Sequence, residues 1–133
     1  MTLEGGCLCG ETRFGVSGTA TNRCCCHCRS CRGASGAPFV AWATFSSAEF
    51  RVTRGKLSQY ASSEKVLRGF CGTCGTALTY AHAARPAEID VATVALDEPS
   101  RLAPEFHIWV SHKLAWVALA DGLPQYAEWR QGT

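Results

Sequence analysis

Cysteine is the residue type that most distinguishes this sequence, because nine of its 133 residues are cysteines and five of these fall between positions 24 and 31. A packed core has no use for such density, because a thiol packs no better than an alanine or a valine. Thiolates are, however, the preferred soft ligands of zinc, and short spacings such as C-x-x-C let one turn present two sulfur atoms to one ion. The cluster therefore predicts a metal site.

Three cysteines of the cluster are spaced so that all three can bind the same metal ion. On an extended backbone, residues i and i+2 face the same side, so Cys26 and Cys28 are expected to project together with His27 turned away. Residues 29–30 then form a turn that brings Cys31 to the same point. Three thiolates leave the fourth position of a tetrahedral ion open, which is typical of sites that do chemistry.

Two further cysteine pairs flank the cluster, and each lies on a glycine-rich turn. Cys7 and Cys9 precede it, and Cys71 and Cys74 follow it. Neither pair can complete a tetrahedron alone, but together they predict a closed four-cysteine site that holds the fold together. The alternative, four unliganded core cysteines, is weaker because spaced pairs on glycine turns are typical of metal sites.

The three-cysteine group has an alternative interpretation as a second closed structural site. Its fourth ligand would be Cys24, Cys25 or His27. Strand alternation places Cys24 on the face of Cys26, and Cys25 on the opposite face. The simpler interpretation of Cys24 and Cys25 is that they are two small buried residues.

Composition and charge restrict the class of protein. Hydrophobic residues at 47% and charged residues at 18% are typical of a globular chain, and 133 residues suit one domain, residues 1–133, with the last few as a mobile tail. No secretory signal is predicted at the N-terminus, and the apolar run 114–120 is too short to cross a bilayer. The expected location is cytoplasmic, where clustered cysteines bind metal more often than they form disulfides.

The net charge argues against nucleic acid as a partner. The formal charge is +2, and seven thiolates with two Zn²⁺ ions would change it to −1. A nucleic-acid-binding protein would usually have a strongly basic face. We therefore expect neither nucleic acid nor a membrane as a partner.

Hydrophobic alternation and turn residues predict a mainly β chain. The stretch 32–37 is expected to be a short helical turn or a loop, 114–120 a strand or a helix, and 122–124 the end of the ordered part. The expected strands lie within residues 2–18 (two strands joined by a turn), 19–28, 38–45, 50–53, 57–61, 66–70, 76–80, 88–96 and 105–110. The strands on either side of residues 71–75 are expected to form a hairpin whose tip binds metal.

The order of the cysteine motifs resembles one known family. C-x-C-G, then C-H-C-x-x-C, then F-C-x-x-C-G is similar to the glutathione-dependent formaldehyde-activating enzymes, which include centromere protein V. The resemblance continues through residues 36–39, 68–71, 96–99 and 107–109, so it spans nearly the whole chain. It implies a small zinc-stabilised, β-tent-like fold of stacked antiparallel sheets with little helix.

The resemblance also implies a chemistry. The family adds the sulfur of glutathione to formaldehyde, or reverses that step, as a carbon–sulfur lyase. Two zinc ions per chain are expected, one structural at the four-cysteine site and one open at Cys26, Cys28 and Cys31, which would be the catalytic residues. An open zinc lowers the pKa of an incoming thiol, and three thiolate ligands favour a soft sulfur ligand over hydroxide.

Several other residues have two interpretations each. Three arginines flank the cluster and would either bind glutathione carboxylates or form a solvated basic edge: Arg23, Arg29 and Arg32. His107 is interpreted as a half-buried histidine beside a core aromatic, Trp109, more readily than as a substrate contact. Trp42 and Trp116 are predicted to lie in the core.

Two other functions are compatible with the same residues. One is a zinc-stabilised binding module without catalysis. The other is a redox sensor in which Cys24 or Cys25 resolves an oxidised Cys31. A small thiol and a small aldehyde are the partners expected if the protein is an enzyme.

Overall fold

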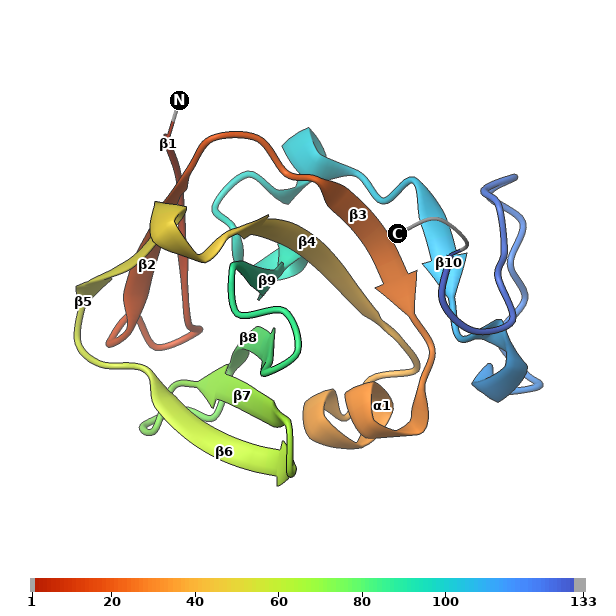
Figure 1. Cartoon of the computed structure of the whole chain (residues 1–133), viewed down its shortest axis with the longest axis horizontal. Coiled ribbons are helices and arrows are strands. Elements are labelled where there is room, and N and C mark those ends of the chain that lie inside the picture. Colours follow the sequence, from red (N-terminus) through yellow and green to blue (C-terminus); the bar gives the residue numbers. More distant parts are fainter. Residues whose placement is uncertain (1, 131–133) are drawn as a thin grey trace.

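Strands make up most of the computed structural model, which describes residues 2–130 and contains one α-helix, α1 (Arg29–Ser35), within that range (Figure 1). The predicted mainly β fold is therefore confirmed. A three-stranded sheet has the order β1 (Thr2–Gly6), β2 (Arg13–Ser17), β5 (Phe50–Arg54). A seven-stranded sheet has the order β10 (Phe106–Ile108), β3 (Asn22–Cys26), β4 (Val40–Ser46), β9 (Glu88–Ala92), β8 (Ala77–His82), β7 (Val66–Phe70), β6 (Ser58–Ser63).

The strand pairs are antiparallel with one exception among the described residues. Strand β10 runs parallel to β3, and its register places His107 opposite Cys25 and Ile108 opposite Cys26. Strand β4 pairs with both β3 and β9 and lies near the middle of the sheet, which agrees with its continuous apolar sequence. The chain therefore brings residues about 80 positions apart to the end of β3 where the cysteine cluster lies.

Two apolar clusters form the core, and each lies under one group of cysteines. The larger includes Phe14, Phe45, Leu78 and Val91, all at most 1% exposed, together with Cys7 and Cys71. The smaller packs Trp42, Phe106 and Ile108 with Cys26 and Cys31. Phe14 and Val16, two positions apart on β2, share the inward face, and most residues of β4 are buried.

The strand that carries the cysteine cluster is shorter than predicted. It ends at Cys26, and Cys28 is instead the N-cap of α1, where its sulfur accepts the backbone N–H of Cys31 at 3.3 Å. The helix ends at Gly36, whose left-handed backbone (φ 67°) lets its N–H bond to the carbonyl of Arg32. A capped helix therefore forms in residues 29–35, where the sequence predicted a turn followed by a short helical turn or a loop.

The C-terminal third departs furthest from prediction. Residues 114–120 form neither strand nor helix, and Trp116 is 72% exposed rather than part of the core. Residues 122–124 do not end the ordered part, because Gln125 bridges to His107 and the Tyr126 ring packs edge-on against Phe106. The expected mobile tail includes residues 131–133, which lie outside the described residues.

Two further strands end earlier than predicted. Strand β9 gives way to a 3₁₀ turn, η2 (Thr93–Ala95), and β10 stops before Trp109, whose backbone is left-handed. In residues 2–130, no helix has the length and apolar character needed to cross a membrane.

Candidate metal centres and active site

Cys7, Cys9, Cys71 and Cys74 come together from two turns that have the same construction. Their four sulfur atoms all lie within 4.8 Å of one another. In the β1–β2 turn the N–H of Cys7 bonds to the carbonyl of Thr12, and in the β7–β8 turn the N–H of Cys71 bonds to that of Thr76, both at 3.0 Å. A glycine with a positive φ closes each turn, so the backbone can fold round a common point.

Hydrogen bonds to three of these sulfur atoms, those of Cys7, Cys71 and Cys74, suit the thiolate form. The N–H groups of Thr73 and Cys74 donate to the sulfur of Cys71, each at 3.4 Å, and the N–H of Thr12 donates to Cys7 at 3.2 Å. Hydrogen bonds from Thr76 lower the pKa of Cys74 to about 5. Four sulfur donors in this environment fit a thiolate-binding metal ion.

Cys26, Cys28 and Cys31 form the second group, as predicted from their spacing. Their sulfur atoms lie within 4.8 Å of one another, with Cys26 and Cys31 both 4% exposed. Hydrogen bonds from the thiols of Cys26 and Cys31 lower the pKa of Cys28, and the same bond to Cys28 raises the pKa of Cys26. Three sulfur donors, one of them readily ionised, could hold a second metal ion.

Cys24 and Cys25 belong to neither sulfur group in the described chain. Both are buried, and burial raises the pKa of Cys24 to about 12 and that of Cys25 to about 11. Such thiols are poor ligands and poor nucleophiles. Their environment therefore agrees with the interpretation as small buried residues.

A cavity of about 360 Å³ opens beside the three-cysteine group. Its volume lies within the usual range for small-molecule sites. The residues that line it come from β3, α1, β4, β7, β8, β9 and the C-terminal third: Cys26, Cys28, Arg29, Ser30, Cys31, Trp42, Arg68, Tyr80, Asp90, Ile108, Trp109, His112 and Trp129.

Arg68 is a cavity residue to which the sequence assigned no role. Both terminal nitrogens of its buried guanidinium lie 3.8 Å from the sulfur of Cys31, and one donates to Ser30 at 3.2 Å. Its Nε donates to Ser62 at 3.0 Å, and the guanidinium lies over the Tyr80 ring. Arg68 therefore ties β7 to α1 and places positive charge beside a sulfur.

The three arginines that flank the cluster have separate environments. Arg29 lines the cavity, whereas Arg23 forms an ion pair with Glu105 at 3.1 Å and Arg32 is absent from the lining. The described structure thus places one of the three, Arg29, where a substrate carboxylate could reach it.

Asp90 is the single carboxyl group among the described residues that line the cavity. Its Oδ1 accepts a hydrogen bond from the hydroxyl of Thr44. Burial raises the pKa of Asp90, so this carboxyl holds a proton more readily than a carboxyl at the surface.

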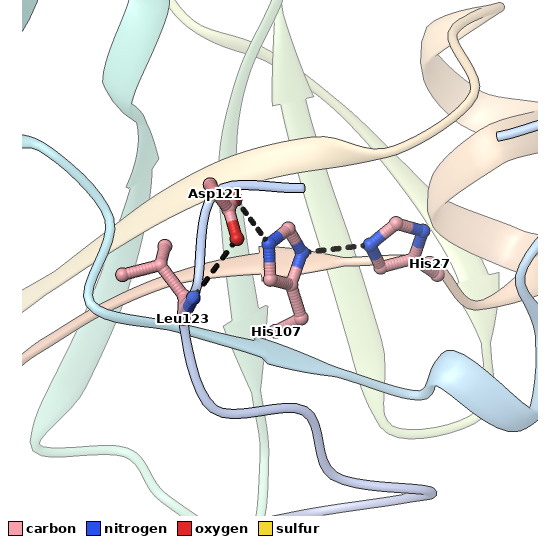
Figure 2. Close-up of polar contacts among 4 residues, drawn as sticks. All are labelled: His27, His107, Asp121 and Leu123. Atoms are coloured by element: carbon pink, nitrogen blue, oxygen red, sulfur yellow. Dashed lines mark hydrogen bonds and ion pairs between the residues drawn. The ribbon is translucent and has the colours of Figure 1, made fainter. Parts of the chain in front are cut away.

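A chain of hydrogen bonds runs from the cysteine cluster to the C-terminal segment (Figure 2). His27 Nε2 lies 2.9 Å from His107 Nδ1, and His107 Nε2 lies 2.8 Å from Asp121 Oδ2. The N–H of Leu123 donates to Asp121 Oδ1 at 3.0 Å. His27 and His107 are 0% and 1% exposed, so His107 is fully buried and bonded on both nitrogens rather than half-buried as predicted.

No sequence pattern indicates that His27, His107 and Asp121 act together, because Asp121 is 94 positions from His27 and lies in a stretch without periodicity. Burial lowers the pKa of His27 to about 4, and the hydrogen bond from His107 lowers the pKa of Asp121. His27 is therefore a neutral donor or acceptor, and its ring packs against Phe39 and His107.

Two sequence comparisons relate the chain to known proteins. The sequence model of the glutathione-dependent formaldehyde-activating enzymes matches residues 2–112. An uncharacterized lyase of Schizosaccharomyces pombe is 33% identical over 79 residues, which are 59% of this chain and 57% of that protein.

A crystal structure of a Rhodobacter sphaeroides protein has the same fold. It aligns with a TM-score of 0.60 at 24% identity, over 92% of this chain and 98% of that one. At this identity the likeness concerns the fold alone. The family match over most of the sequence, together with the paired cysteine groups, shows that the chain belongs to the family of glutathione-dependent formaldehyde-activating enzymes.

Proposed function

We propose that this protein is a zinc-dependent carbon–sulfur lyase that adds a small thiol such as glutathione reversibly to formaldehyde or another small aldehyde. The observation that carries the proposal is the position of three cysteine sulfurs within 4.8 Å of one another at the wall of a cavity of about 360 Å³. Cys26, Cys28 and Cys31 hold the catalytic ion. Cys7, Cys9, Cys71 and Cys74 hold a structural ion in one domain that spans residues 1–133.

The reaction forms one carbon–sulfur bond. The sulfur of the thiol attacks the carbonyl carbon, the thiol proton leaves, and the carbonyl oxygen takes up a proton to give a hydroxymethyl thioether. A bound zinc ion would lower the pKa of the thiol and so supply a thiolate near neutral pH. Arg68 fixes the sulfur of Cys31, so that the ligand sulfurs keep their spacing.

Asp90 is the residue that moves the proton in this proposal. Its carboxyl lines the same cavity, and its raised pKa suits both the acceptance of a proton from the thiol and its return to the carbonyl oxygen.

The test combines metal spectroscopy with a rate measurement. In the cobalt-substituted protein, glutathione should change the sulfur-to-metal absorption bands of wild type but not of Cys28→Ser. Exchange spectroscopy by NMR should show faster interconversion of glutathione, formaldehyde and their adduct than the uncatalysed background. Cys25→Ala is the matched control, because Cys25 is buried outside both sulfur groups, and it should behave like wild type.

Two outcomes would contradict the proposal in different ways. If no small thiol changes the cobalt spectrum and exchange stays at the background rate, the protein is better described as a zinc-stabilised binding module. Spectra that respond to thiols without faster exchange would indicate a thiol-binding site that acts on a different electrophile.

A further inference from the structure

Four aromatic rings dominate the wall of the cavity beside the three-cysteine group. Trp42 and Tyr80 come from β4 and β8, with ring centroids 5.9 Å apart. Trp109 and Trp129 come from the C-terminal third and meet edge to face at 5.7 Å. Formaldehyde can cover only a small part of such a surface, so the rings suit the other substrate.

Trp109 has a backbone conformation that a bulky residue rarely adopts. Its φ is 57°, and within residues 2–130 it is the one residue other than glycine with a positive φ. Such a conformation costs free energy and persists where surrounding contacts impose it. Here the N–H of Trp109 bonds to the carbonyl of Glu128 at 3.0 Å, and that of Val110 to Tyr126 at 3.1 Å. The C-terminal segment thus holds the Trp109 ring at the cavity.

The cavity offers few partners to a thiol with two carboxylates. Arg68 is already hydrogen-bonded to Cys31, Ser30 and Ser62, which leaves Arg29 as the arginine available to a ligand. Three thiolates with one divalent ion carry a net charge of −1, and an ionised Asp90 would make it −2, which the positive charges of Arg29 and Arg68 offset. A neutral ligand needs no charged partner in such a cavity, whereas the two carboxylates of glutathione would have to share Arg29.

From these contacts we infer that the thiol substrate carries an aryl group, as benzyl mercaptan does, whose ring packs on the aromatic wall while its sulfur reaches the three cysteines. This inference rests on the proposed function and specifies its substrate class. Aromatic contacts add to the apolar area that is buried, so an aryl thiol should bind about tenfold more tightly than an alkyl thiol of similar acidity.

The test is a titration of the cobalt-substituted protein with benzyl mercaptan, 2-mercaptoethanol and glutathione, followed by the sulfur-to-metal absorption bands. We expect benzyl mercaptan to bind most tightly, with an advantage of about tenfold over 2-mercaptoethanol. Trp109→Gly should remove most of this advantage without unfolding the protein, because glycine adopts a φ of 57° freely. Trp129→Ala, at a half-exposed position, is a second variant with the same expectation.

Trp116→Gly is the control, because Trp116 is exposed and lies outside the cavity lining, and the advantage should remain. The inference is overturned, and the proposed function kept, if glutathione binds most tightly and both cavity variants leave the order of affinities unchanged. If no thiol changes the spectrum, the proposed function fails and the inference fails with it.

The hydrogen-bonded chain of Figure 2 carries a second inference, independent of the substrate. An ionised carboxylate only accepts hydrogen bonds, so His107 Nε2–H donates to Asp121. In a neutral His107, Nδ1 then accepts the Nε2–H of His27. His27 Nδ1, which is buried and has no partner among the described residues, is left without a proton, and the reverse tautomer would bury an unpaired donor there.

Both hydrogen bonds of His27 go to the same strand. Its backbone N–H bonds to the carbonyl of Ile108 at 3.1 Å, and its ring bonds to His107. Strand β10 is held in turn by the C-terminal segment, because the N–H of His107 bonds to the carbonyl of Pro124 and the N–H of Tyr126 bonds to that of His107. The residue between Cys26 and Cys28 is therefore anchored by residues 121–126, beyond the part of the chain that the family model matches.

The structure assigns His107 and Asp121 as positioning residues that hold the Cys26–Cys28 loop for metal binding. Loss of such a supporting hydrogen bond usually weakens metal binding by about tenfold or more. Asp121→Ala should therefore speed zinc release from the three-cysteine site by about tenfold and leave the four-cysteine site unchanged. Asp121→Asn should restore most of the slow release, because its amide oxygen can still accept the Nε2–H of His107, although its NH2 group loses the hydrogen bond from the N–H of Leu123.

Transfer of zinc from the fully loaded protein to a chromophoric chelator should occur in two phases, one for each site, and so measures the two release rates separately. Imidazole ¹⁵N spectra should show the Nε2–H tautomer of both histidines in wild type and in Asp121→Asn. Asp97→Ala is the control, because Asp97 forms its ion pair with Arg13 in the other sheet. Equal acceleration of both phases, or Asp121→Asn as fast as Asp121→Ala, would overturn the assignment.

Discussion

At the scale of single residues, the candidate active site depends on how buried charges are paired. The guanidinium of Arg68 donates hydrogen bonds to Cys31, Ser30 and Ser62, and it lies over the ring of Tyr80. Asp90 is half-buried on the same cavity, and Thr44 satisfies one of its oxygens. Substitutions of these two residues should have different effects. The charge of Arg68 is compensated by its neighbours, whereas burial disfavours the charge of Asp90.

Arg68→Lys should loosen the sulfur of Cys31 although it keeps the charge. A lysine ammonium cannot replace the planar fork that reaches a sulfur and two hydroxyls, so buried partners lose hydrogen bonds at a cost of about 1–3 kcal/mol. Thermal unfolding and the cobalt spectrum should both change. Arg101→Lys, at an exposed arginine, is the control, and equal behaviour of the two variants would contradict this role.

Asp90→Asn should make the folded protein more stable at neutral pH. Because burial raises the folded pKa, Asp90 contributes most stability below its unfolded pKa, and this contribution is lost as pH rises through the folded pKa. Asparagine has no charge to bury and keeps the bond from Thr44. The melting temperature of the variant should exceed that of wild type at pH 7.5, with a gap that narrows toward pH 5.

The measurement needs zinc content checked at each pH, so that metal loss is not counted as a titration. In the proposed function the same variant should slow adduct exchange. A wild type that is more stable than Asp90→Asn at pH 7.5 would show that the ionised carboxylate is not opposed by burial.

At the scale of elements, β7 and α1 place the cysteines by opposite means. Strand β7 packs tightly, since a Cβ at Gly69 would lie 2.1 Å from Thr79 Oγ1 and 2.8 Å from Leu57. Helix α1 is open at Gly33, where an added Cβ meets nothing within 4 Å. The helix is held by its ends, with Cys28 as N-cap and Gly36 as C-cap.

Substitution of each of these two glycines by alanine therefore gives a matched pair of variants. Gly69→Ala should destabilise the protein by about 1–3 kcal/mol, because β7 and β8 must separate at the hairpin that carries Cys71 and Cys74. Gly33→Ala should stabilise it by about 0.5–1 kcal/mol, because alanine loses less backbone entropy in a helix. Urea unfolding of both zinc-loaded variants measures the difference, and two changes of the same sign would contradict it.

At the scale of the whole molecule, the two sulfur groups stand on separate apolar clusters. The four-cysteine group joins the tip of the β1–β2 sheet to the tip of the β7–β8 hairpin, so it links the two sheets across the larger cluster. The three-cysteine group lies where β3 meets α1, on the smaller cluster and open to the cavity. Loss of the four-cysteine site should therefore destabilise the whole fold, whereas loss of the three-cysteine site should disturb only the region around the cavity.

Cys74→Ser should prevent stable folding, whereas Cys28→Ser should leave a folded protein with one zinc ion. Structural zinc binding is worth about 10 kcal/mol or more, which is comparable with the whole stability of a domain, about 5–15 kcal/mol. Zinc analysis of wild type should give about two ions per chain, one released before the other. A single ion in fully loaded wild type, or a Cys28→Ser protein as unstable as Cys74→Ser, would contradict the division into two sites.

The sequence by itself determined the mainly β fold and the grouping of seven cysteines into sets of four and three. Alternation sets which side chains face inward, and short cysteine spacings with glycines bring sulfurs together within one turn. The two distant pairs were joined into a set of four because neither pair completes a tetrahedron alone. The sequence favoured Cys24 and Cys25 as two small buried residues, but it left each of them open as a fourth ligand of the three-cysteine site. The family followed from the order of these motifs along the chain.

Only the tertiary structure decided what surrounds the three cysteines. Arg68 reaches Cys31 across 37 positions, and Trp129 and Asp121 reach the same region from a C-terminal segment without periodicity. The backbone hydrogen bonds that hold that segment join residues 124–128 to residues 107–111, so no local sequence pattern predicts them. Contacts between residues far apart in sequence depend on how whole elements pack, and that packing sets the walls of the cavity and the supports of the Cys26–Cys28 loop.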